Sequence, residues 1–174
     1  MRRLILFRHA KAEPPDGLSD HERGLVESGR AAAAAMGRWL AANGLRPDVA
    51  LCSTAARARA TWELASEAFE DAPEVRFEGG IYGASPETLL ALTRRAGGDA
   101  GTLIIVGHNP GLGQFVEMLA TKDARDGSKE QLEALPTAGV AVLDLPAGEW
   151  SATAFGEARL ARTMTPKILK DGDE

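Results

Sequence analysis

The chain has 174 residues, of which 44% are hydrophobic and 26% charged, and it carries a net charge of -5. This length suits one domain with a sizeable core, so we expect a single domain over residues 1–174. The negative charge argues against a nucleic-acid partner, because such binding usually rests on a basic surface. A lone cysteine cannot form a disulfide within the chain, and no apolar run reaches the roughly 18 residues needed to cross a bilayer. We therefore expect a soluble, cytoplasmic protein without a membrane partner.

Short apolar runs alternate along the chain with longer stretches of helical periodicity. This alternation is typical of strands joined by crossover helices, and it predicts an α/β fold with a mostly parallel sheet. In chain order, the sequence predicts a strand at 3–7, a helix at 26–42, a strand at 49–52, a helix at 55–69, a helix that begins after Ser85, a strand at 102–106, a helix through 112–119, a strand at 139–145 and its hairpin partner at 150–155. We expect residues 122–135 to form a surface loop and residues 171–174 to form a frayed end.

Two of the three histidines directly follow predicted strands. Arg8 and His9 come after the strand at 3–7, and His108 and Asn109 come after the strand at 102–106. In open α/β sheets the ligand crevice lies at the carboxyl ends of the strands. Both imidazoles are therefore expected to face one pocket.

A third predicted strand leads into a helix whose first turn is rich in hydroxyls and arginines. Residues 53–61 read Ser-Thr-Ala-Ala-Arg-Ala-Arg-Ala-Thr. A helix N-terminus favours anions through its free N–H groups and its dipole. Arg57 lies one turn after Ser53, so its side chain should point back toward the strand end, whereas we interpret Arg59 as an exposed surface residue. His21 is likewise interpreted as a surface residue, and Cys52 as a buried strand residue rather than a nucleophile.

Several motifs occur in an order that resembles the histidine phosphatase superfamily, and specifically its SixA-type phosphohistidine phosphatases. The motifs are Arg8-His9-Ala10, which is similar to the Arg-His-Gly signature; residues 20–29, similar to Asp-x-x-Arg-x-Leu-x-x-x-Gly; residues 53–61, similar to Ser-Pro-x-x-Arg-Ala-x-x-Thr but with threonine in place of proline; Gly107-His108-Asn109-Pro110; and Thr137-Ala138-Gly139. The resemblance covers nearly the whole chain. It implies a three-layer α/β/α sandwich of the phosphoglycerate mutase-like type, in a compact form without a lid insertion.

The resemblance also implies a role for each matched residue. A neutral His9 would attack phosphorus and form a phosphohistidine intermediate, which water then hydrolyses. Arg8, Arg57 and a protonated His108 would hold the phosphoryl oxygens. Ser53, Asn109 and the backbone near it would complete the binding site, and Arg23 could be either catalytic or structural. No metal ion or other cofactor is expected, because cationic side chains would repel one and the carboxylates show no ligand spacing.

A proton donor for the leaving group has no clear counterpart in this sequence. Glu78 does not align convincingly with the acid of larger family members, and three acids of the first loop are equal candidates: Glu13, Asp16 and Asp20. Because the leaving nitrogen of phosphohistidine departs without strong acid help, the missing acid favours phosphohistidine over alkyl phosphates. The partner is therefore expected to be a phosphohistidine-bearing protein that binds transiently.

Two other functions fit the same residues. A phosphatase of small phosphate monoesters would share every site residue and differ in the pocket walls. A non-catalytic module would use the arginines to bind a phosphoprotein without chemistry. A mutase activity fits less well, since it needs an enclosed site to retain its intermediate.

Overall fold

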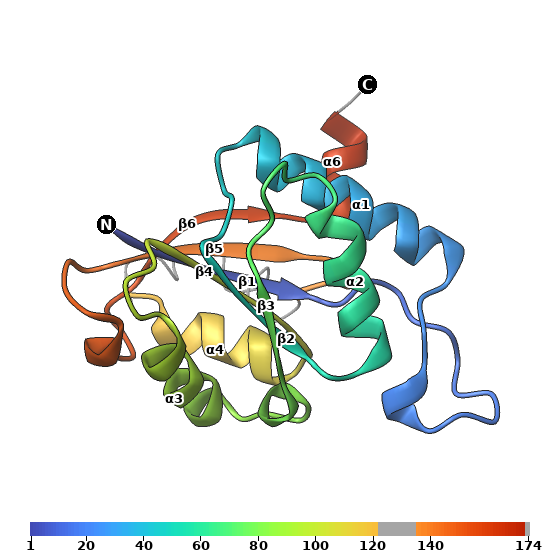
Figure 1. The fold of residues 1–174 in the computed structure, drawn as a ribbon, viewed down its shortest axis with the longest axis horizontal. Coiled ribbons are helices and arrows are strands. Elements are labelled where there is room, and N and C mark those ends of the chain that lie inside the picture. The colour runs from blue at the N-terminus through green and yellow to red at the C-terminus, as the bar shows by residue number, and fades with distance from the viewer. Residues whose placement is uncertain (122–134, 173–174) are drawn as a thin grey trace.

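A computed structural model describes residues 1–121 and 135–172 of the chain, and it forms a three-layer α/β/α sandwich (Figure 1). The central sheet has six strands in the order β3-β2-β4-β1-β5-β6. The first four of these run parallel, while β5 is antiparallel to both of its neighbours. The strands are β1 (Arg2–Arg8), β2 (Val49–Ser53), β3 (Val75–Glu78), β4 (Thr102–Gly107), β5 (Val140–Leu145) and β6 (Arg159–Met164).

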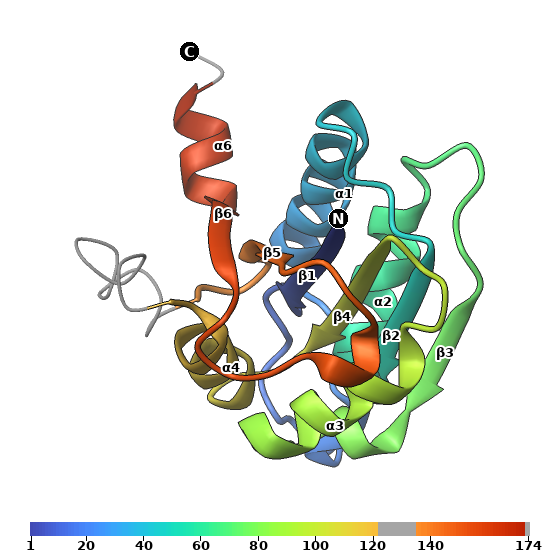
Figure 2. The ribbon, with the colours of Figure 1, turned by 90° about the vertical axis from the view of Figure 1, so that its left-hand side faces the viewer.

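Helices cover both faces of the sheet. On one face lie α1 (Glu27–Ala42), α2 (Ala56–Ser66) and the short α6 (Pro166–Gly172), and on the other lie α3 (Pro86–Ala96) and α4 (Gly111–Leu119) (Figures 1 and 2). Between α2 and α3 the chain forms only β3 and the single-turn 3-10 helix η2 (Gly79–Ile81). This confirms the compact form expected from the sequence, which has no lid insertion at this point.

Two cores form because side chains alternate between the faces of each strand. In β1, Leu4 and Leu6 pack toward α3 and α4, whereas Ile5 and Phe7 pack toward α1 and α2. These four side chains are fully buried. Strand β4 divides in the same way, which explains why residues 103–106 read as an uninterrupted apolar run.

The predicted strand at 150–155 is wrong. Residues Trp150–Ala152 form a 3-10 helix, and the strand that follows β5 and pairs with it in antiparallel is β6. The indole of Trp150 is buried under α3 and donates from Nε1 to the carbonyl oxygen of Ala100 at 2.7 Å, which holds this segment away from the sheet edge. Strand β6 was not predicted because its residues are mostly half-buried or exposed and show no apolar alternation.

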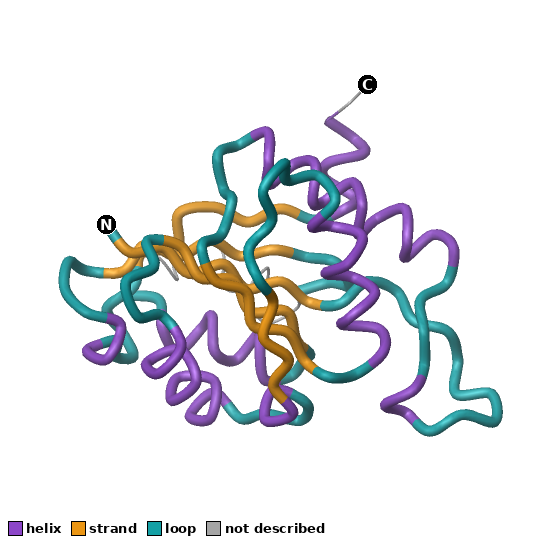
Figure 3. Tube along the Cα trace, viewed as in Figure 1, coloured by secondary structure: helices purple, strands orange, loops and turns teal. Residues whose placement is uncertain are grey.

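Two other short elements were also missed. Strand β3 has four residues, lies at the other edge of the sheet and shows no alternation of burial (Figure 3). Helix α6 begins at Pro166, where the Thr165 hydroxyl oxygen accepts from the N–H of Ile168 at 3.1 Å. Two of the residues expected to fray, Asp171 and Gly172, end this helix, while most of the loop predicted at 122–135 lies outside the described residues. In the described part of the chain no helix is long and apolar enough to cross a membrane.

Candidate active site

The two strand-end histidines lie next to each other. Strands β1 and β4 are paired with Arg8 opposite Gly107, and the His9 N–H donates to the Gly107 carbonyl oxygen at 3.0 Å. The imidazole rings of His9 and His108 are 5.2 Å apart between their centroids, with 52° between their planes. Parallel pairing of the two central strands therefore produces this juxtaposition directly.

Hydrogen bonding fixes the tautomer of His9. Its Nδ1 lies 2.7 Å from the carbonyl oxygen of Ala10. Because a carbonyl can only accept, Nδ1 carries the proton and Nε2 holds the lone pair. The pKa of His9 is lowered to about 4, mainly by burial and also by the positive charges of Arg57, Arg8 and Arg23, while the hydrogen bond to Ala10 opposes this lowering. His9 is therefore a neutral imidazole at pH 7, as an attack on phosphorus requires.

The peptide that holds His9 is itself tied to helix α2. The N–H of Ala10 donates to the hydroxyl oxygen of Thr61 at 2.9 Å, and that hydroxyl donates to the carbonyl oxygen of Arg57 at 2.7 Å. Thr61 is fully buried. The threonine of the 53–61 motif thus connects the first turns of α2 to the end of β1.

His108 contacts Ser53 at the end of the neighbouring strand. Its Nε2 lies 2.7 Å from the Ser53 hydroxyl oxygen, which also accepts from the N–H of Ala55 at 3.2 Å. The pKa of His108 is lowered to about 3, mainly by burial and also by His9 and Arg57, while the Asp20 carboxylate opposes this lowering. His108 is therefore neutral in this structure. The protonated form expected from the sequence needs the added negative charge of a phosphoryl group.

Arg8 and Arg57 each present a guanidinium at this edge of the sheet. Arg8 donates from Nη1 to the carbonyl oxygen of Leu135 at 3.0 Å. Arg57 donates from Nη1 and Nη2 to the carbonyl oxygen and the Oδ2 atom of Asp20, at 2.7 and 3.0 Å. Its side chain is only 7% exposed.

Three nitrogen atoms of this group lack a hydrogen-bond partner among the described residues although they are buried: Arg8 Nε, Arg57 Nε and His108 Nδ1. A buried donor without a partner costs free energy, so a group with several acceptor oxygens would stabilise the site. Phosphoryl oxygens accept such hydrogen bonds. The only other orphaned nitrogen in residues 1–121 and 135–172 is Nε of Arg2, at the opposite end of β1.

Comparison with known proteins also indicates a site for a phosphoryl group. Residues 4–80 match the histidine phosphatase superfamily (branch 1). A SixA structure from Nakamurella multipartitia has 31% sequence identity and a TM-score of 0.83, and the match covers 95% of this chain and 96% of that one. The chain belongs to the histidine phosphatase superfamily, among its SixA-type members.

Two other proteins are similar to this chain over most of its length. A SixA structure from Agrobacterium tumefaciens has 31% identity and a TM-score of 0.78, covering 95% of this chain and 98% of that one. An uncharacterized protein of Mycobacterium tuberculosis is 40% identical over 163 residues, which are 92% of this chain and all of the relative. These two matches cover 95% and 92% of this chain.

Asn109 of this histidine phosphatase uses its side chain within the protein. Its amide Nδ2 donates to the carbonyl oxygen of Leu135 at 2.8 Å, and its Oδ1 accepts from the N–H of Gly113 at 3.1 Å. Leu135 therefore receives hydrogen bonds from both Asn109 and Arg8. The geometry gives the Asn109 side chain a part in fixing the first turn of α4 and the position of Arg8, while substrate binding by Asn109 and the backbone near it stays a prediction.

Arg23 lies at the rim of the site and braces the loop between β1 and α1. Its Nε and Nη2 donate to Oδ1 of Asp20 at 3.0 and 2.9 Å, and its Nη1 donates to the carbonyl oxygen of Glu13 at 2.9 Å. All three guanidinium nitrogens are thus engaged by this loop. The structure favours the structural one of the two roles considered for Arg23.

Sequence reasoning did not place Tyr82 in the site and interpreted His21 as a surface residue. The Tyr82 ring makes edge contacts with the rings of His108 and His21, at 5.4 and 5.1 Å between centroids. His21 Nε2 lies 2.8 Å from the hydroxyl oxygen of Thr54, and the Tyr82 hydroxyl donates to Asp20. No motif marks Tyr82, although it is the only tyrosine in the chain.

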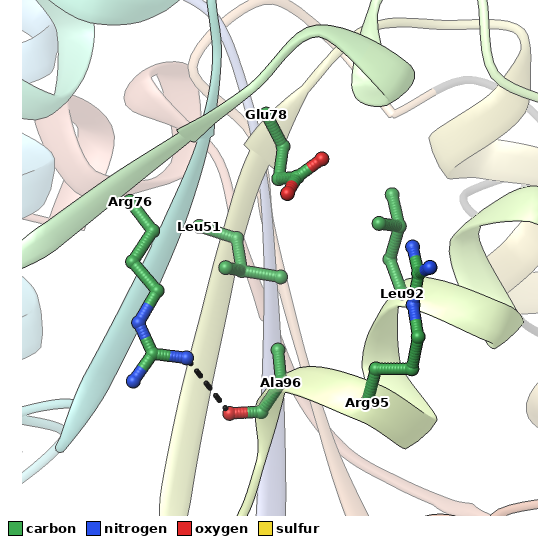
Figure 4. A pocket seen from close by; sticks show the side chains of 6 residues that line it. All are labelled: Leu51, Arg76, Glu78, Leu92, Arg95 and Ala96. Carbon is green, nitrogen blue, oxygen red and sulfur yellow. Dashed lines mark hydrogen bonds between the residues drawn. The ribbon is translucent and has the colours of Figure 1, made fainter.

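Glu78 lies apart from the histidines. Its side chain lines a cleft of about 330 Å³ between β3 and α3, opposite Arg95 and near Leu51 and Leu92 (Figure 4). None of His9, Arg8 and Arg57 lines this cleft. The arrangement does not favour Glu78 as the proton donor.

Cys52 is buried and Arg59 is exposed, as the sequence predicted. Burial raises the pKa of the Cys52 thiol to about 12, so the thiol stays protonated and unreactive. Arg59 is exposed and stacks over Phe77, 5.2 Å from the ring centroid. Within the described residues, no group of three or more His, Cys, Asp and Glu side chains is arranged to hold a metal ion.

Proposed function

We propose that this histidine phosphatase hydrolyses phosphohistidine on another protein, without a metal ion and through phosphorylated His9. The observation that carries the proposal is a neutral His9, protonated on Nδ1, together with two orphaned guanidinium donors on Arg8 and Arg57 and an unpartnered ring nitrogen on the neighbouring His108. A nucleophile thus faces donors that can neutralise a transferring phosphoryl group.

The reaction follows in two steps. In the first, Nε2 of His9 attacks phosphorus and a new N–P bond forms, while the bond from phosphorus to the leaving nitrogen breaks and the substrate imidazole, which solvent has protonated on its other ring nitrogen, leaves in neutral form. In the second, water attacks phosphorus, the Nε2–P bond breaks, and inorganic phosphate leaves with His9 neutral again. Arg8 and Arg57 hold the phosphoryl oxygens in both steps, and the incoming negative charge favours protonation of His108 as a further donor.

The ionised state of the acid beside Arg57 supports phosphohistidine as the substrate. Arg57 binds the carboxylate of Asp20, whose pKa is lowered to about 2, mainly by the hydrogen bond from Tyr82 and also by Arg57, so this carboxylate is ionised at neutral pH. An ionised carboxylate cannot protonate a leaving alkoxide. The imidazole that leaves from phosphohistidine has no such requirement, and the names of the two SixA structures with 31% identity propose the same substrate.

The experiment compares three substrates on protein treated with EDTA: a phosphohistidine-bearing phosphotransfer domain, para-nitrophenyl phosphate and a sugar phosphate. We expect phosphate to be released fastest from the phosphohistidine domain, at a rate unchanged by EDTA. Faster hydrolysis of the sugar phosphate would replace the proposal with a phosphatase of small esters. Binding of the phosphorylated domain without release of phosphate would indicate a non-catalytic module.

A further inference from the structure

Asp20 lies in the loop between β1 and α1, at the start of the 3-10 helix η1 (Asp20–Glu22), and it contacts three side chains from different parts of the chain. We propose that Asp20 is a positioning residue for the phosphoryl transfer proposed above: it holds one edge of the Arg57 guanidinium, so that the edge with Nε is presented to the phosphoryl group. Tyr82 fixes the Asp20 carboxylate in turn. This inference rests on the proposed function.

The hydrogen bonds of Arg57 define which edge remains for the substrate. A guanidinium is planar and carries its N–H donors in a fixed fork. Both terminal nitrogens of Arg57 donate to Asp20, one to its carbonyl oxygen and one to Oδ2, whereas Nε is buried without a partner among the described residues. Asp20 therefore occupies the terminal edge, and the edge formed by Nε and one terminal nitrogen is left to bind oxygen atoms in a bidentate manner.

The carboxylate of Asp20 is held on both oxygens. Oδ1 accepts two hydrogen bonds from Arg23, and Oδ2 accepts from Arg57 and from the Tyr82 hydroxyl. With donors on both sides, the carboxylate has little freedom to rotate. Arg23 thus acts on Arg57 through Asp20, which gives a reason for an aspartate three residues before an arginine in this loop.

Tyr82 connects this arrangement to the second histidine. Its ring packs edge-on against His108, and the guanidinium carbon of Arg57 lies 5.8 Å from the centroid of the same ring. Two of the groups expected to hold the phosphoryl oxygens, His108 and Arg57, therefore contact the same ring. A displacement of Tyr82 would change the positions of both His108 and Arg57.

Neither protein stability nor the attraction of charges explains the contacts of Asp20, and this indicates a positioning role. The Asp20 side chain is 51% exposed, and ion pairs at such exposure contribute little to stability. A negative charge beside a phosphoryl group also opposes its binding by simple electrostatics. The contribution of Asp20 must then be to the orientation of Arg57. Such a contribution lowers the energy of the transition state, where the alignment of donors with the transferring group matters most.

The test measures kcat, KM and melting temperature for D20N and Y82F, with E22Q as the control. Glu22 belongs to the same 3-10 helix, and its side chain makes no hydrogen bond or ion pair with the described residues. With the phosphohistidine domain and with para-nitrophenyl phosphate, we expect D20N to lower kcat at least about tenfold with KM changed less than threefold. Y82F should lower kcat in the same direction, the two effects should not multiply in the double variant, and melting temperatures should stay within a few degrees of wild type.

The outcomes separate this inference from the proposed function. If wild type turns over and D20N has the same kcat, Asp20 does not position Arg57 and the inference is overturned. The same holds if D20N binds inorganic phosphate more tightly and turns over faster, because Asp20 would then compete with the phosphoryl group for Arg57. If wild type itself shows no turnover, the proposed function fails first.

Discussion

The Nδ1 proton of His9 is donated to the carbonyl oxygen of Ala10, the next residue in the chain, at 2.7 Å. The N–H of the same Ala10 is bound by Thr61, so the orientation of the nucleophile depends on a peptide group anchored to α2. Preorganisation of this kind removes motions that would otherwise separate His9 from phosphorus. A change at Thr61 should therefore alter the orientation of His9.

Replacement of Thr61 by valine tests this anchor. T61V keeps the shape of the side chain but leaves the buried Ala10 N–H without an acceptor, so we expect a loss of about 2 kcal/mol in the free energy of unfolding, measured by urea denaturation. Turnover should fall as well. T93V is the matched control, because the fully buried Thr93 donates only to the carbonyl oxygen of Leu89 within its own helix. Equal effects of the two changes on both stability and turnover would contradict the anchoring role.

Replacement of Arg57 by lysine tests the forked contact to the phosphoryl group. R57K keeps the positive charge but loses the planar fork and both hydrogen bonds to Asp20, so we expect kcat/KM to fall by about 10²–10³. R59K, on the exposed side of the same helix, should stay within about twofold of wild type. An R57K enzyme with near-normal kcat/KM would show that charge alone suffices at this position.

The two neutral histidines make stability depend on pH. In the folded protein the pKa values of His9 and His108 are lowered to about 4 and about 3, below the usual value of about 6.5 in an unfolded chain. Below pH 6.5 the unfolded chain therefore binds protons that the folded protein does not, and stability present above pH 6.5 is lost as the pH falls toward 4. We expect a loss of about 2 kcal/mol for each histidine, or about 4 kcal/mol for the two together, between pH 7 and pH 5 in urea denaturation.

The variant H9N/H108N is the control for this pH dependence, since it removes both groups and leaves the remaining carboxylates in place. Its free energy of unfolding should change much less between the same two pH values. A double variant with the same loss as wild type would assign the effect to other groups.

Gly29 lies where helix α1 passes the chain that follows His9. A Cβ atom at this position would lie 2.3 Å from the carbonyl oxygen of Lys11. Because that contact is with backbone, G29A must displace either α1 or the Ala10–Lys11 segment, and we expect destabilisation of about 1–3 kcal/mol together with reduced turnover. G24A has no atom within 4 Å of the added carbon and should leave the melting temperature nearly unchanged. Similar melting temperatures for the two variants would contradict this packing argument.

The sequence was informative wherever local pattern and strand direction determine the outcome. His9 and His108 follow apolar strands, and parallel pairing brings such positions to one edge of the sheet. Thr61 and Gly29 belonged to recognised motifs, but their functions as an anchor and as a close contact depend on atoms of Ala10 and Lys11 that only the folded chain places beside them.

The sequence was uninformative where a contact joins distant segments without a pattern. Tyr82 reaches Asp20 across 62 positions and lies in a glycine-rich turn that matches no motif. The indole of Trp150 docks beneath α3, and this tertiary contact overrides the strand-like sequence around it. Asn109 is adjacent to His108 in the chain, yet its two hydrogen bonds within the protein could not be inferred from that adjacency.

The measurement that tests the central claim most directly is the trapping of phosphorylated His9. Protein treated with EDTA is mixed with the phosphohistidine domain, quenched within milliseconds at alkaline pH and mapped by mass spectrometry, in parallel with H9A. We predict an acid-labile phosphoryl group on His9 that forms and decays at rates consistent with turnover, and at least a 10³-fold loss of turnover in H9A, of roughly the size seen when an enzyme loses its nucleophile. Substantial turnover by H9A, or turnover by wild type with no phosphoryl group on His9 at any time, would contradict the mechanism.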